Sequence, residues 1–74
     1  MHELPDDFAD TLARVLEPRQ REAAAEIIER ATMLDDEGLR RFLELFAARV
    51  RASDAPITAG ELRRFLQRAS RAWR

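Results

Sequence analysis

The sequence contains no cysteine and no lysine, and its one histidine is His2. The absence of cysteine excludes disulfides and thiolate metal sites. A single histidine next to the N-terminus leaves Ser-His-Asp or Cys-His catalysis and ordinary zinc sites without the residues they need. Gly38 and Gly60 are isolated, so no phosphate-binding glycine loop is present. We therefore expect no catalytic residues, no metal site and no cofactor, and we do not expect an enzyme.

Long apolar runs are also absent. No segment approaches the ~20 consecutive apolar residues of a membrane span, and the acidic start of the chain lacks the basic and apolar regions of a signal peptide. These features predict a cytoplasmic protein without a membrane span. The 74 residues, 46% hydrophobic and 36% charged, predict a single globular domain over 1–74. So short a chain buries only roughly 60% of the surface that its unfolded form exposes, so its stability is marginal.

All 13 basic residues are arginine. A GC-rich coding sequence produces this bias, and we read it first as the background of a prokaryotic genome. Selection for planar, bidentate hydrogen-bond donors is the functional alternative. Alanine, leucine, arginine and glutamate dominate the composition, and all four residue types favour helix.

The spacing of apolar residues predicts an all-α fold, a small four-helix bundle. The helices are expected at about 5–16, 18–33, 36–52 and 59–73. Because the residue before a proline disfavours helical geometry, Glu17 predicts a break between the first two helices. No stretch alternates with a period of two, so strands are not expected.

Local signals mark two helix starts. Asp35 is a good N-cap for the third helix. Thr58 and Glu61 have the spacing of a capping box, and Ile57 and Leu62 have the spacing of a hydrophobic staple. These signals predict that the fourth helix begins at Ala59.

The amphipathic stripes predict one core and leave a few apolar residues outside it. The predicted core comprises Phe8, Leu12, Ile27, Leu39, Phe42, Phe46, Leu62, Phe65 and Leu66. Met33, Leu45 and Trp73 are the apolar residues that this core accounts for least. They are therefore candidates for a protein interface.

Charge is distributed unevenly along the chain. Residues 1–37 hold 11 acidic residues and 4 arginines, for a net charge of −7, whereas residues 38–74 hold 3 acidic residues and 9 arginines, for +6. The two halves can complement each other within one fold. Two further interpretations stay open, namely association of the acidic face of one copy with the basic face of another, and binding of an acidic external partner.

The fourth predicted helix carries a basic face opposite its apolar stripe. Arg64, Arg68 and Arg71 lie on that face and complete the candidate protein interface. An ordinary bundle helix also has a solvated charged face, so these arginines alone identify no ligand. Residues 57–62 faintly look like the entry to a helix-turn-helix unit, but no tight turn follows within residues 62–74.

We expect a small non-enzymatic helical protein that acts through protein–protein contacts, as an adaptor, a regulator or an accessory subunit. Its partner is expected to be another protein or a second copy of itself. The alternative is a small nucleic-acid-binding protein that uses the arginine-rich C-terminal half.

Overall fold

A computed structural model of the protein describes residues 7–72, with side chains described for residues 7–70. This part of the chain forms four α-helices and one short 3-10 turn, and it contains no strand. The all-α prediction of a small helical bundle is confirmed. The elements are α1 (Phe8–Val15), the 3-10 turn η1 (Pro18–Gln20), α2 (Ala23–Thr32), α3 (Asp36–Ala52) and α4 (Ala59–Ala72).

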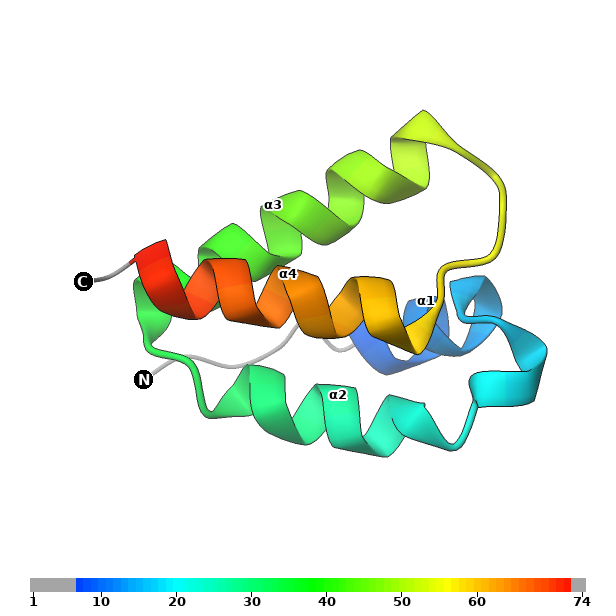
Figure 1. Ribbon diagram of the computed structural model, residues 1–74, viewed down its shortest axis with the longest axis horizontal. Coiled ribbons are helices and arrows are strands. Elements are labelled where there is room, and N and C mark those ends of the chain that lie inside the picture. The colour runs from blue at the N-terminus through cyan, green and yellow to red at the C-terminus, as the bar shows by residue number, and fades with distance from the viewer. Residues whose placement is uncertain (1–6, 73–74) are drawn as a thin grey trace.

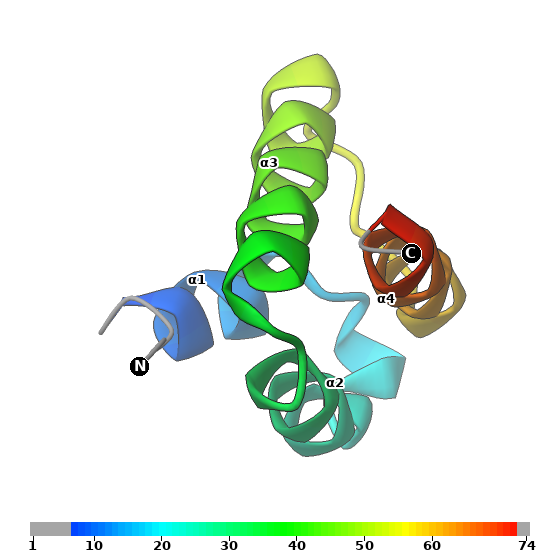
Figure 2. The same ribbon diagram turned by 90° about the vertical axis from the view of Figure 1, so that its left-hand side faces the viewer.

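The helices surround one core, and α2 and α4 run in the same direction while α3 runs back against both (Figure 1). Seen end-on, α1 and α4 lie on opposite sides, with α3 and α2 completing the ring (Figure 2). The principal extents are 32 × 21 × 18 Å. α3 and α4 share the most extensive helix contact, and α2 packs on both of them.

The first break in the chain lies where the sequence predicted it. α1 ends at Val15, and Leu16 and Glu17 adopt extended ψ angles of 143° and 125° before Pro18. The extended residues pair with the α3–α4 connection, because Glu17 N donates to Ile57 O and Ile57 N donates to Val15 O, each at 2.8 Å. The predicted start of this helix at Pro5 lies outside the described residues.

The prediction of a continuous second helix over 18–33 is wrong at its N-terminal end. Residues 18–20 form η1, and α2 begins only at Ala23. Gln20 turns its side chain toward α4, where its Oε1 accepts a hydrogen bond of 2.8 Å from Ala59 N. This hydrogen bond joins residues far apart in the sequence, so the periodicity of apolar residues could not predict it.

α3 has the predicted bounds and the predicted cap. The Asp35 carboxylate accepts a hydrogen bond of 2.7 Å from Gly38 N. Gly38 is buried, and a Cβ at this position would lie 2.9 Å from the capping oxygen of Asp35 and 3.6 Å from the backbone oxygen of Ala69. Glycine therefore leaves room for both the cap and the approach of α4.

α4 begins at Ala59, as predicted, and both bonds of the capping box are formed. Glu61 N donates to the Thr58 hydroxyl at 3.1 Å, and Thr58 N donates to the Glu61 carboxylate at 3.4 Å. Ile57 and Leu62, the predicted staple, are 1% and 0% exposed and belong to the same buried cluster.

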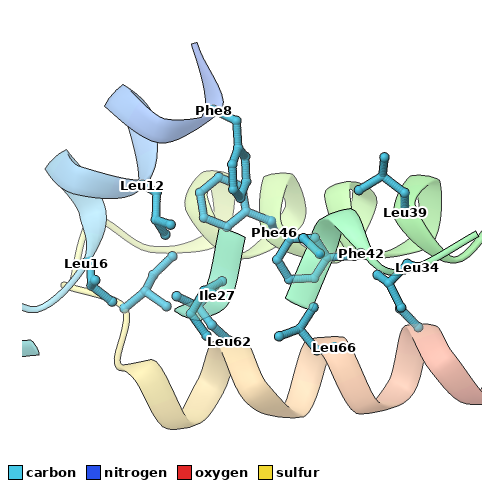
Figure 3. Close-up of a cluster of buried hydrophobic side chains, with 13 residues drawn as sticks. Phe8, Leu12, Leu16, Ile27, Leu34, Leu39, Phe42, Phe46, Leu62 and Leu66 are labelled. Carbon is cyan, nitrogen blue, oxygen red and sulfur yellow. The ribbon is translucent and has the colours of Figure 1, made fainter. Parts of the chain in front are cut away.

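The core is apolar, and the side chains of all four helices meet in it (Figure 3). Eight of the nine predicted core residues are buried, while Phe65 is partly buried at the edge of the cluster. Phe8 ties α1 to α3, since its ring centroid lies 6.0 Å from that of Phe42 and 5.3 Å from that of Phe46. The cluster also takes in residues that the core prediction omitted, namely Leu16, Ala31, Leu34, Ile57 and Ala69.

Candidate functional site

A groove of about 440 Å³ lies between the C-terminal end of α2, with the two residues that follow it, and one face of α4. Its apolar base consists of Leu34 and Leu66, which are also part of the core. The rest of its lining is formed by Arg30, Met33, Arg63, Gln67 and Ser70. The groove thus combines apolar surface with hydrogen-bond donors, the mixture typical of ligand and protein-binding sites.

Met33 is the most conspicuous residue of this groove. It caps the C-terminus of α2, and the residue is 80% exposed, which makes it the one exposed large hydrophobic residue among the described side chains. Methionine is unbranched and polarisable, and it packs well against surfaces of varied shape. An exposed methionine beside a groove with an apolar base is therefore suited to contact a second molecule.

The basic side of the groove is organised by one carboxylate. Glu26 of α2 accepts from Arg63 Nη2 of α4 at 3.1 Å and lies 3.4 Å from Arg30 Nε on its own helix. The hydrogen bond from Arg63, the charge of Arg63 and the charge of Arg30 hold the pKa of the Glu26 carboxyl below its ordinary value. One carboxylate thus faces two guanidinium groups, one from each of the two helices.

The same ion pair divides the seam between α2 and α4 into two different surfaces. On the N-terminal side, a shallow hollow of about 350 Å³ is lined mainly by polar and charged residues, including Arg19, Gln20 and Glu22. On the C-terminal side lies the groove with Met33 and the apolar base. The C-terminal part therefore offers the larger apolar surface for a partner, since the hollow on the N-terminal side has only Ala23 and Ala59 as apolar lining residues.

Among the predicted interface residues whose side chains the structure describes, Met33 alone lines the groove. Met33 lies at the groove, but Leu45 is partly buried on α3 and does not line it. Arg64 and Arg68 are exposed on α4, outside the groove lining. Arg71 belongs to α4, but its side chain is outside the described part, and Trp73 lies outside the described residues altogether.

Sequence reasoning missed the groove as a unit, although part of its pattern was available. Arg63, Gln67 and Ser70 recur at i, i+4 and i+7, which places them on one face of α4 beside the apolar stripe. The spacing does not say which helix packs next to that face. The position of α2, with Arg30 and Met33, supplies the other wall.

Among the described residues, no buried side chain is polar or charged, and no group of three or more potential metal ligands occurs. The carboxyls whose pKa values are clearly lowered, Glu26 and Glu61, each owe the shift first to a hydrogen bond from an arginine.

Within residues 7–72, no helix is long and apolar enough to cross a membrane. Comparison of the chain with protein-family models, with curated protein sequences and with solved structures finds no match.

Proposed function

We propose that the protein is a small non-enzymatic interaction module that binds a protein partner through the groove between α2 and α4. The observation that carries this proposal is the 80% exposure of Met33 at a groove with an apolar base. A chain of this size has few apolar side chains, and Met33 adds no burial to its own core, so its apolar surface is available to be buried against a partner.

The chemistry of the groove supports a protein rather than a small polar ligand. Methionine and arginine are enriched at the centres of protein interfaces, and Met33, Arg30 and Arg63 all line this groove. The arginines present planar donors to carboxylates, and the base formed by Leu34 and Leu66 accepts an apolar side chain. An apolar side chain accompanied by a carboxylate is the partner surface that matches both features.

A nucleic-acid-binding function is the second candidate, and the exposure of Arg64 and Arg68 on α4 favours it. The ion pair between Arg63 and Glu26 weakens this alternative, because it brings an acidic side chain to the basic helix. Because affinity for nucleic acid comes largely from arginine and lysine contacts with phosphates, a carboxylate that already pairs with an arginine opposes it. We therefore rank protein binding first.

The test is affinity capture from the native source with the immobilised full chain after nuclease treatment. Wild type is compared with Met33→Arg, which adds a charge at the groove, and with Ala47→Arg, which adds the same charge at an exposed position of α3 outside it. Each retained protein is then purified and titrated by calorimetry. We expect a partner that wild type and Ala47→Arg bind and that Met33→Arg binds at least tenfold more weakly.

Two results would contradict the proposal. One is that every purified partner binds Met33→Arg as tightly as wild type. The other is that retention disappears after nuclease treatment, which would favour the nucleic-acid alternative.

A further inference from the structure

The exposed Met33 lies at the groove between α2 and α4, and its side chain is of a kind that an apolar groove can bind. Met33 is 80% exposed and lines the groove together with Leu34 and Leu66, which form its apolar base. We infer that the occupant of the groove is a second copy of this chain, with Met33 of each copy seated between α2 and α4 of the other. This inference rests on the proposed function, because it names the protein that the groove binds.

In a two-fold dimer, the groove of each copy can bind Met33 of the other copy. In an isologous interface the same patch is used twice, so a protruding side chain on one copy enters the recess of the other and the exchange is reciprocal. α2 and α4 lie side by side with a common direction, on the side of the molecule away from the outer faces of α1 and α3 (Figures 1 and 2). Two such pairs facing each other form an intermolecular four-helix contact.

Charge complementarity points to the same occupant. The groove lining contains two arginines, Arg30 and Arg63, and no carboxylate. Glu29 is exposed on α2 one helical turn before Met33, so it accompanies Met33 into the contact. A two-fold axis then brings the Glu29 carboxylate of one copy toward the guanidinium groups of the other, which Glu26 balances only in part.

The decisive measurement is sedimentation equilibrium of the full chain up to about 100 µM, well above the micromolar dissociation constant expected for a small interface. Wild type is expected to rise from the monomer mass of 8.6 kDa toward the dimer mass. Met33→Arg should weaken association at least tenfold, because it places a cation against Arg30 and Arg63 of the other copy. Ala47→Arg, the matched control on α3, should associate like wild type. Circular dichroism verifies that each variant keeps its helix content.

A second measurement locates the contact. Dilution of wild type should change the NMR signals of the Met33, Leu34 and Leu66 methyl groups, and the Glu29→Arg variant should associate more weakly than wild type. A monomer at about 100 µM, a dimer indifferent to Met33→Arg, or dilution shifts confined to other residues each overturns the inference. A monomeric wild type that loses a different protein partner on Met33→Arg overturns only the choice of a second copy and leaves the proposed function standing.

Discussion

Arg49 of α3 and Glu61 of α4 form the shortest ion pair in the described part of the molecule, with 2.8 Å between Arg49 Nε and Glu61 Oε2. The Arg49 side chain is 18% exposed. Its two terminal nitrogens also donate to the backbone oxygens of Ser53, Ala55 and Pro56 at 3.3–3.4 Å. One guanidinium group thus joins the end of α3, the connection that follows and the first turn of α4.

The removal of this guanidinium should destabilise the fold. Arg49→Ala is expected to lower the free energy of unfolding by about 1–2 kcal/mol, since partly buried, charge-assisted hydrogen bonds contribute more than exposed ion pairs. Urea denaturation monitored by circular dichroism measures the loss. Arg49→Lys should recover only part of it, because lysine lacks the planar fork that reaches several acceptors.

The matched control is Arg51→Ala, on the same helix but exposed. Its effect should stay within about 0.5 kcal/mol. Equal losses from Arg49→Ala and Arg51→Ala would show that the hydrogen bonds of Arg49 contribute nothing measurable.

The same ion pair predicts how stability depends on pH. The hydrogen bond from Arg49 is the largest influence on the pKa of the Glu61 carboxyl, which it holds below its ordinary value of 4.5 in the folded protein. The unfolded chain therefore binds the proton more readily, and the stabilisation, complete above about pH 4.5, is lost as pH falls through the lower folded value.

The thermal midpoint of wild type should decrease as the pH is lowered from about 4.5. Glu61→Gln should show a weaker dependence, because the amide keeps the shape of the side chain but does not titrate. If the two proteins lose stability in parallel, Glu61 is not a source of the acid sensitivity.

The sequence predicted the parts of the fold that local chemistry controls. The break before Pro18, the Asp35 cap and the start of α4 at Ala59 all depend on residues within a few positions of one another. Hydrophobic periodicity also identified most of the core, because each helix must bury its apolar face.

The candidate site was harder to predict because it depends on which helices are neighbours. Met33 could be singled out as an apolar residue without a place in the core, but nothing local says that α4 supplies the opposite wall. The ion pair of Arg63 with Glu26 joins residues 37 positions apart, so it too depends on the packing of α2 against α4 and could not be predicted from local sequence. Nothing in the residues next to Arg63 indicates that Glu26 lies beside it.

The capping box of α4 gives a further prediction of stability. Thr58→Ala removes the hydroxyl that accepts from Glu61 N and should cost about 1 kcal/mol. Ile57→Asp should cost more, because it places a charge where the side chain is 1% exposed. In a domain of this size, each kcal/mol lowers the thermal midpoint by roughly 4–8 °C, which differential scanning calorimetry resolves.

Thr58→Ser is the control for the cap, since serine keeps the accepting hydroxyl and should stay close to wild type. If neither Thr58→Ala nor Ile57→Asp moves the midpoint, the first turn of α4 does not contribute to stability in the way that its hydrogen bonds indicate.

The last prediction separates protein binding from nucleic-acid binding. Replacement of Arg64, Arg68 and Arg71 together with glutamate reverses one face of α4, since these positions recur at i, i+4 and i+7. Its matched control, Arg14, Arg19 and Arg21 replaced together with glutamate, makes the same change of net charge in the acidic half. Circular dichroism establishes that both triple variants remain helical before binding is compared.

We expect wild type to show no binding to duplex or single-stranded nucleic acid at about 150 mM salt, where the Debye length is about 8 Å and only close phosphate contacts persist. The reason is that α2 lies beside α4 and brings Glu26 against Arg63, so the basic surface is interrupted at the seam. Fluorescence anisotropy over a range of salt concentrations measures the affinity. Salt-sensitive binding by wild type that the control retains and the folded α4 variant loses would reverse this ranking. The arginine face of α4, rather than the Met33 groove, would then be the functional surface.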